Sequence, residues 1–318
     1  MAGALRQAAA PPPGLHHADR VWPLSSCYAD LWIRLLESRG LEPRAMLGFA
    51  AALEWEGDQF TFLKPDSGDL ASLYGLRIQE LAIWNDLERH VAAQVAQGRP
   101  VLVELDAHHL PDLVGSSYRQ EHGKTTVAIL GLDVSARRCD YIHNASRDVL
   151  EGEDYDALLR PARIGGLPLP PYAEMVKRDP GATQGPLEET ACRLLARHAA
   201  RRGGRSQVAA FRAAFTAQLA ALLERPAEFH PWAFNTLRQF GAGAELLADG
   251  LDWLEAQVPA GLGAAAAPAR GVAAGAKALQ FRVARLVARG RMDPCDEIFD
   301  ALATDEAALS ARLDRFLA

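Results

Sequence analysis

The sequence predicts an α+β protein in which a mixed N-terminal half, with an early helix and an antiparallel sheet, precedes an all-helical bundle. Strand-like runs are confined to the first half, where they follow helix-like segments and do not alternate with them as in βαβ units. In the second half alanine is abundant and apolar residues recur at helical spacing. We therefore expect a disordered leader (1–20), an α+β domain (21–165), a linker (166–187) and a helical domain (188–318).

The first helix is expected in SSCYADLWIRLLESRG (residues 25–40), where a hydroxyl side chain stands at the N-cap and Gly40 ends the helix. The segment QFTFLK (59–64) alternates apolar and polar residues, as a half-buried strand does. A second helix is predicted in WNDLERHVAAQVAQG, between Asn85 as its cap and Gly98. The run RPVLVELD follows as a strand, and TTVAILGLD with RRCDYIHN predicts an antiparallel hairpin.

The predicted linker contains five prolines, which is typical of a linker or of an extended strap. Beyond it, apolar residues at helical spacing predict amphipathic helices that pack in a bundle. They are Val208, Phe211, Phe215, Leu219 and Leu222 in one segment, and Leu279, Val283 and Leu286 in another. The sequence has no glycine-rich phosphate-binding loop after a strand.

Composition narrows the class of protein. The chain has 318 residues, a formal net charge of −6 and no long uninterrupted apolar run, so we do not expect a membrane span. Lys and Arg are scattered, which predicts neither a nucleic-acid partner nor a membrane-surface contact. The first stretch, MAGALRQAAAPPPGLHH, has one Arg and no continuous apolar segment, which is not typical of a signal peptide. We expect a cytoplasmic protein.

The four cysteines, Cys27, Cys139, Cys192 and Cys295, are too far apart in sequence to predict a zinc site, and no metal is expected. Without a secretory signal they are expected to be reduced thiols. Three of them are expected to fill the core, as free cysteines commonly do. Cys27 differs because it opens the first helix, where unpaired backbone N–H groups and the positive end of the helix dipole favour a thiolate.

A cysteine nucleophile needs an imidazole as its base, and the imidazole needs an orienting oxygen. His122 immediately precedes the predicted strand TTVAILGLD, and Asn144 ends the partner strand. The papain-like arrangement has the same residue types in this order, so Cys27, His122 and Asn144 are the predicted catalytic residues, with backbone N–H groups near the thiol as the oxyanion site. Asp140 is an alternative orienting group, and Asp106, at the end of another strand, is expected to cap or to pair.

The sequence leaves open whether the His122 side chain faces Cys27. In many papain-like proteins the histidine lies six residues before a glycine of its strand, and here Thr125 is six residues before Gly131. A displacement of three residues along a strand reverses the face, so His122 needs a bulge or a loop to reach Cys27. Lys124 is expected to be solvated, to hold the imidazole neutral by repulsion, or to bind a phosphopantetheine phosphate.

Several segments resemble the bacterial domain-of-unknown-function family 1839, and together they cover nearly the whole chain. They are SSCYADLWIRLLESRGLEPRAMLGFAAALEWEGDQFTFLK, RPVLVELDAHHLPDLVGSSYRQEHGKTTVAI, YIHNASRDVLEGEDYDALLR, FHPWAFNTLRQFGAGAELLADGLDWL and GAKALQFRVARL. The family is often encoded beside amino acid:carrier-protein ligases and small acyl-carrier-like proteins. It is similar, more distantly, to the N-terminal domain of butirosin-biosynthesis protein H, a papain-like protein that moves an aminoacyl group from a carrier-protein thioester to an amine.

The resemblance implies a papain-like fold for the α+β domain. It points to Cys27, His122 and Asn144, with Lys124, Thr125 and Thr126 in the matching segment. Ser26 stands where asparagine is expected, which weakens the case for a side-chain amide in the oxyanion site. His108 and His109 stand where aromatic residues are usual, so they are not expected to be catalytic.

The leading expectation is a papain-like cysteine acyltransferase or thioester-processing protein of specialised metabolism, which moves an aminoacyl group from a carrier protein to a small amine acceptor. No cofactor is expected, and the phosphopantetheine arm of the carrier protein would enter as part of the substrate. Two alternatives stay open: a cysteine amidase or peptidase, with water as acceptor, and a non-catalytic papain-like scaffold that binds a carrier protein or a ligase. The position of Thr125 favours the last alternative.

Overall fold

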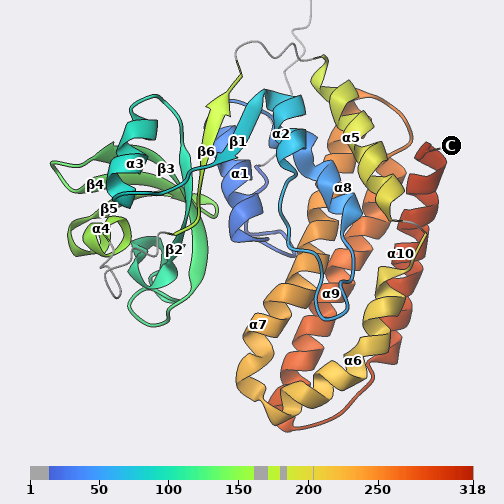
Figure 1. Cartoon of the computed structure of the whole chain (residues 1–318). Helices are drawn as coiled ribbons and strands as arrows, with labels where there is room; N and C mark the ends of the chain where they lie inside the picture. The colour runs from blue at the N-terminus through green and yellow to red at the C-terminus, as the bar shows by residue number, and fades with distance from the viewer. Residues whose placement is uncertain (1–13, 161–170, 180–184, 203, 318) are drawn as a thin grey trace, which may run out of the picture.

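The computed structural model describes residues 14–160, 171–179, 185–202 and 204–317 (Figure 1). It confirms the predicted α+β order, because a six-stranded antiparallel sheet and its helices come from the N-terminal half and helices alone make up the C-terminal half. The sheet forms one lobe and the long helices form the other, with the first helix between them (Figure 1). Within these ranges no helix has both the length and the apolar character needed to cross a membrane.

The elements of the N-terminal half include several short helices. The helices are α1 (Cys27–Glu37), the 3-10 helix η1 (Pro43–Ala52), α2 (Ser67–Tyr74), α3 (Leu87–Val95), the short 3-10 turns η2 (Ala107–His109) and η3 (Pro111–Leu113), and α4 (Gly152–Leu159). The strands are β1 (Leu76–Glu80), β2 (Val101–Asp106), β3 (Lys124–Asp133), β4 (Arg138–His143), β5 (Ser146–Glu151) and β6 (Ala173–Arg178). The N-cap of α3 is Asp86, one residue after the predicted cap Asn85.

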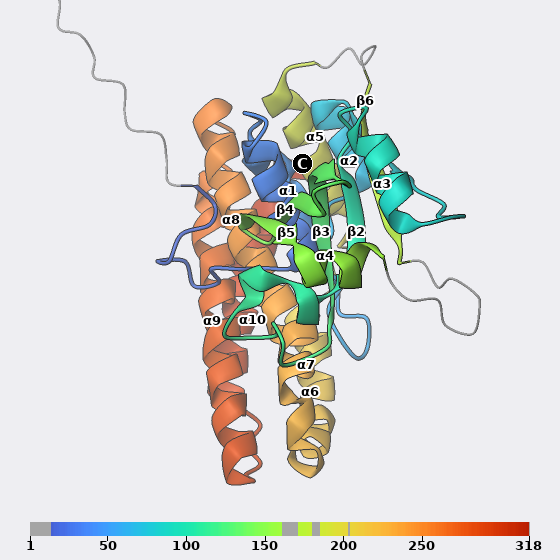
Figure 2. The same cartoon turned by 90° about the vertical axis from the view of Figure 1, so that its left-hand side faces the viewer.

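The C-terminal half folds into helices that run beside one another (Figures 1 and 2). They are α5 (Leu187–Arg201), α6 (Gln207–Glu224), the 3-10 turn η4 (Pro226–Glu228), α7 (Phe229–Ala233), the π-helical turn η5 (Phe234–Arg238), α8 (Gln239–Gln257), α9 (Gly263–Arg289) and α10 (Asp296–Leu317). All five apolar residues predicted for the first amphipathic helix are buried in α6.

The sheet has the strand order β1-β6-β2-β3-β4-β5, and every neighbouring pair is antiparallel. The predicted hairpin is present as β3 and β4, with Val127 opposite His143. A bulge between Ile129 and Gly131 shifts the register of this pair. β6 lies within the stretch predicted as a linker, and it inserts between β1 and β2.

The segment QFTFLK, residues 59–64, is not one of the six strands, contrary to its prediction. Two of its backbone N–H groups donate hydrogen bonds to the helical half instead. The N–H of Phe60 donates to the carbonyl of Asn235 at 3.1 Å, and the N–H of Leu63 donates to Oε1 of Gln239 at 2.8 Å. Alternating residues predict an extended backbone, but the tertiary structure decides which groups satisfy its N–H donors.

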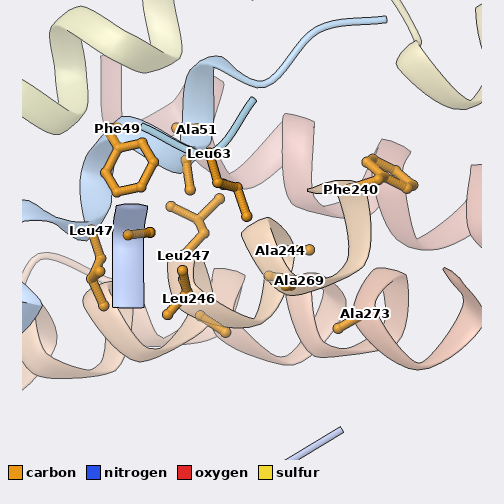
Figure 3. Close-up of a cluster of buried hydrophobic side chains, with 14 of the residues drawn as sticks. Leu47, Phe49, Ala51, Leu63, Phe240, Ala244, Leu246, Leu247, Ala269 and Ala273 are labelled. Atoms are coloured by element: carbon orange, nitrogen blue, oxygen red, sulfur yellow. The ribbon is translucent and has the colours of Figure 1, made fainter. Parts of the chain in front are cut away.

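The sheet separates two hydrophobic cores. One face is covered by α3 and α4, and Val103 and Tyr155 are buried there. The other face packs against α1 and continues into the helical half, so Leu102 of β2 belongs to the same core as Leu247 of α8. Figure 3 shows part of this larger core, in which side chains from η1, from the 59–64 segment and from α8 and α9 meet.

α1 lies inside this larger core. Its buried residues are Tyr28, Ala29, Asp30, Leu31, Trp32, Ile33, Leu35 and Leu36. The helix contacts β3 and β4 on one side and η1 on another. Each large apolar side chain buried in this way stabilises the fold by about 1.5–3 kcal/mol, so the start of the helix has a fixed position relative to the sheet.

Part of the predicted leader packs against the helical half. Leu15 is buried, and Nη1 of Arg20 lies 2.6 Å from Oδ2 of Asp249 on α8. Residues 14–20 are therefore part of the folded structure, and residues 1–13 lie outside the described ranges.

The close approach of Trp22 to α8 gives a stability prediction. A Cβ atom at Gly241 would lie 2.6 Å from Nε1 of Trp22, and this indole cannot retreat because it is buried and donates to the carbonyl of Ala273 at 3.0 Å. We expect Gly241→Ala to lower the free energy of unfolding by about 1–3 kcal/mol, measured by urea denaturation. Gly131→Ala is the control, since its nearest neighbour lies at 3.5 Å. Equal stability of the two variants would contradict the prediction.

Candidate functional site

A cavity of about 440 Å³ lies between the N-terminus of α1 and the sheet. Its walls come from α1, the 62–64 segment, strands β2, β3 and β6 and the π-helical turn η5. The lining residues are Cys27, Tyr28, Phe62, Lys64, Leu102, Glu104, Lys124, Thr125, Thr126, Tyr172, Glu174, Phe234 and Asn235. The structure therefore brings the predicted site residues Cys27 and Lys124 together in one cavity, and Thr125 lies at its edge.

Cys27 is the first residue of α1, and Ser26 fixes that start. The Ser26 hydroxyl accepts from the N–H of Ala29 at 3.1 Å and donates to the carbonyl of Leu63 at 2.8 Å. Both bonds are internal, so Ser26 serves as the helix cap and as an anchor for the cavity wall. Cys27 is partly exposed at the cavity, whereas Cys139 is buried, and burial raises the pKa of the Cys139 thiol to about 12.

The floor of the cavity is the α1-facing side of β2 and β3. Glu104 lies opposite Thr126, and Asp106 lies opposite Lys124. Alternate residues of a strand point to the same face, so Leu102, Glu104 and Thr126 share this side. Nζ of Lys124 lies 2.7 Å from Oε1 of Glu104, which neutralises the Glu104 carboxylate at the cavity wall.

Glu174 of β6 is a second carboxylate in the cavity, and it is only 6% exposed. The hydroxyls of Tyr28 and Tyr172 donate to it at 2.6 and 2.9 Å, and Nζ of Lys64 lies 3.4 Å away. Burial and the hydrogen bond to Glu174 raise the pKa of Tyr28, and the same two causes raise the pKa of Tyr172 to about 12. Both phenols therefore remain hydrogen-bond donors to the Glu174 carboxylate, which lines the same cavity as Cys27.

The helical half contributes the π-helical turn η5 to this cavity. Phe234 and Asn235 line the wall, and the carbonyl of Asn235 accepts from the N–H of Phe60. Oε1 of Gln239 binds the N–H of Leu63, and its Nε2 donates to the carbonyl of Phe234 at 3.1 Å. Single π-helical turns commonly occur at functional sites, and this one joins the two halves at the cavity.

His122 lies in the loop before β3, and its side chain is 73% exposed. Its Nδ1 lies 2.6 Å from Oδ2 of Asp106, whose Oδ1 also accepts from the backbone N–H groups of His108 and Gly123. Burial acts to raise the pKa of Asp106, but the bonds from His122 and from these N–H groups outweigh it and lower that pKa. Of the described residues, those that line the Cys27 cavity do not include His122, which precedes the lining residue Lys124 by two positions.

The strand register shows which face of the sheet Thr125 occupies. Thr125 lies opposite Leu105, on the face covered by α3 and α4, and its hydroxyl contacts His143 there. Lys124 and Thr126 face α1, whereas His122 lies in the loop before the strand begins at Lys124. The bulge between Ile129 and Gly131 reverses the alternation of side chains along β3. Thr125, six residues before Gly131, therefore faces α3 and α4 and not α1.

The predicted orienting residues make other contacts. Asn144 has a positive φ of 48° in the turn between β4 and β5, and its Nδ2 lies 3.2 Å from Nε2 of His143. Asp140 forms an ion pair with Arg147. The carboxylate that contacts His122 is Asp106, whereas Asn144 contacts His143 and Asp140 pairs with Arg147. Asp106 was expected to cap or to pair, and it does both.

A buried polar chain lies on the far side of β3. Nδ1 of His143 lies 2.6 Å from Oδ2 of Asp112, whose Oδ1 accepts from the hydroxyl of Tyr141 at 2.6 Å. Nε2 of His143 lies 2.8 Å from the Thr125 hydroxyl. These bonds tie η3 to β3 and β4, and they fix the end of the strand that carries Lys124.

Several cavity residues were missed by reasoning from the sequence. Glu104 is the one carboxylate inside the apolar run RPVLVEL, which is a usable signal for a functional side chain. Glu174 and Tyr172 fall in the stretch predicted as a linker, and Phe234 falls in the predicted helical domain, where no site residue was expected. No group of three or more His, Cys, Asp or Glu side chains that could hold a metal ion occurs in the described part of the chain.

Comparison with known proteins gives a family for both halves. Residues 11–178 match the model of the DUF1839 N-terminal domain, and residues 184–315 match that of the DUF1839 C-terminal domain. A search of curated proteins finds no significant match. Because the two matches span nearly the whole sequence, the chain belongs to the DUF1839 family.

Proposed function

We propose that this protein is a papain-like cysteine acyltransferase that moves an acyl or aminoacyl group from a carrier-protein thioester to an amine. The observation that carries the proposal is the position of Cys27, which opens a fixed helix and lines a cavity of about 440 Å³ against the sheet. The helix start offers unpaired N–H groups beside the thiol, which suit an oxyanion. A cavity of this size fits a small acyl group together with the end of a pantetheine arm.

The reaction would proceed in two balanced steps. The Cys27 thiolate attacks the thioester carbonyl, a bond from its Sγ to the carbonyl carbon forms, and the carrier thiolate leaves and takes up a proton. The amine then attacks the new thioester, so a C–N bond forms and the Cys27 C–S bond breaks. The proton lost by the amine returns to the thiolate through the base.

We assign proton transfer to His122, with Asp106 as its orienting group. The bond from Nδ1 to Asp106 fixes the ring and leaves Nε2 for proton exchange, which is the division of roles in hydrolase triads. His122 is two residues from Lys124, which lines the cavity and lies opposite Asp106 on the neighbouring strand. Contacts between catalytic groups are often long in the absence of substrate and tighten when it binds.

The edge of the cavity suits a phosphopantetheine arm. Lys64 and Lys124, which line the cavity, are exposed cations, and Phe62 and Tyr172 line it with partly exposed rings. Lysine binds phosphate as a point charge, and the apolar rings suit the methylene and amide groups of the arm. A carrier protein is therefore the partner that we propose, in a soluble setting in the cytoplasm.

A second candidate is a non-catalytic scaffold that binds a carrier protein or ligase. It is favoured by the absence of any imidazole among the cavity-lining residues in the described ranges. This candidate requires Cys27→Ala to keep full activity in the pathway and unchanged carrier binding. It also requires the thiol to react with iodoacetamide no faster than a model thiol at neutral pH.

The acyltransferase proposal predicts a covalent intermediate on Cys27. On incubation with an aminoacyl N-acetylcysteamine thioester, intact-protein mass spectrometry should show one added acyl group, because the first step needs no acceptor. Cys27→Ala should abolish the adduct, and Cys192→Ala, which removes another partly exposed thiol, should leave it unchanged. Labelling that persists in Cys27→Ala would overturn the assignment of the nucleophile.

Adding an amine to the same assay separates transfer from hydrolysis. For an acyltransferase we expect the amide to form at the expense of the free acid, since the amine and water compete for one acyl-enzyme. Liquid chromatography with mass spectrometry quantifies both products. Release of the free acid at the same rate, whatever amine is present, would identify an amidase or peptidase instead.

The roles of His122 and Asn144 can be separated by mutation. We expect His122→Ala to slow acylation by roughly 10²–10⁴-fold, the usual contribution of a general base. Asn144→Gly keeps the positive-φ turn and should change the acylation rate less than about threefold, because its contact is with His143. A larger loss in Asn144→Gly than in His122→Ala would restore Asn144 to the catalytic group.

A further inference from the structure

A second cavity, of about 450 Å³, lies on the other side of the segment that walls the Cys27 cavity. It is bounded by the end of η1, by the 54–66 segment and by α5. Phe62 and Lys64 line both cavities, so the two adjoin along this stretch of chain. A group-transfer enzyme needs a second substrate within reach of the first, and the arrangement provides adjoining space for one.

The shared wall has a fixed backbone and two exposed side chains. Leu63, between Phe62 and Lys64, is fully buried, and its N–H and carbonyl are bound by Gln239 and Ser26. Phe62 and Lys64 point away from that core, as alternate residues of an extended segment do. The Lys64 side chain extends into the Cys27 cavity, where its ammonium lies near Glu174 and 4.4 Å from the ring centre of Tyr28. Because both side chains line both cavities, we expect their positions to control passage between the two.

The second cavity is acidic with an apolar floor. Three carboxylates line it, Glu54, Glu56 and Asp66, against the single guanidinium of Arg201 and the shared Lys64. Phe49 and Leu53 supply apolar surface. Asp66 accepts one backbone N–H at 2.7 Å and Glu56 accepts the Thr61 hydroxyl at 2.8 Å, so each carboxylate keeps further acceptor capacity.

One residue in the wall of this cavity has a buried polar atom without a hydrogen-bond partner among the described residues. His198 of α5 lines the cavity and is 2% exposed. Its Nε2 lies 2.5 Å from Oδ2 of Asp69, and its Nδ1 is buried without a hydrogen-bond partner among the described residues. A buried polar atom that lacks a partner costs free energy, and such atoms commonly mark positions where a ligand or water is bound.

We propose that the second cavity binds a small aliphatic molecule with two or more ammonium groups, and that this diamine or polyamine is the acyl acceptor. The carboxylates of Glu54 and Glu56 would bind one ammonium, and the methylene chain would lie on Phe49 and Leu53. The far amine, once deprotonated, would pass between Phe62 and Lys64 to the acylated Cys27. The acceptor role rests on the proposed function, whereas the binding site itself does not.

The test measures binding separately from chemistry. Isothermal titration calorimetry of 1,5-diaminopentane into the full-length Cys27→Ser protein should show one site, and the neutral analogue 1,5-pentanediol should not bind. Glu54→Gln and Glu56→Gln should each weaken diamine binding by roughly two- to fivefold, as expected for loss of a partly exposed ion pair. Glu297→Gln, the same change at an exposed carboxylate of α10, should have no effect.

The outcomes separate the inference from the proposed function. Undetectable diamine binding, or equal affinity in Glu54→Gln, Glu56→Gln and wild type with unchanged thermal melting curves, would overturn the inference even if Cys27 is acylated. Diamine binding that is lost in these variants would uphold the site even if no acyl-enzyme forms. With active protein, the same two variants should raise the KM for the diamine by a similar factor, and Glu297→Gln should leave this KM unchanged.

Discussion

The burial of α1 between the sheet and the helical half is the constraint on which the site depends. Eight residues of this helix are buried, and its first turn is held by Ser26, whose hydroxyl binds both Ala29 and the carbonyl of Leu63. One side chain therefore sets the start of the helix and the position of the wall that separates the two cavities. Because the helix packs on β3 and β4, Cys27 faces the ends of strands that carry ionisable residues.

The charges around Cys27 are arranged in pairs. Each of the two carboxylates in the cavity, Glu104 and Glu174, has a lysine partner at the exposed edge, and Glu174 also has two phenol donors. Paired charges can remain ionised in a partly buried site at modest cost, whereas an isolated one could not.

The site also shows how the two halves of the chain depend on each other. The 59–64 segment from the N-terminal half gives its backbone N–H groups to Asn235 and Gln239 of the helical half, and the π-helical turn brings Phe234 to the cavity in return. An isolated N-terminal half would lose one cavity wall and expose part of the larger core. We conclude that the helical half is a structural part of the site.

The sequence by itself determined the order of elements, the helix that begins at Cys27, the β3–β4 hairpin and the amphipathic pattern of α6, because capping and periodicity are local properties of the chain. Only the tertiary structure decided which residues share the cavity. Strand order placed Glu174 beside Leu102, pairing with Leu105 set the face of Thr125, and the contact to the His122 ring comes from Asp106. These outcomes depend on long-range register and on packing between the halves, which no local pattern encodes.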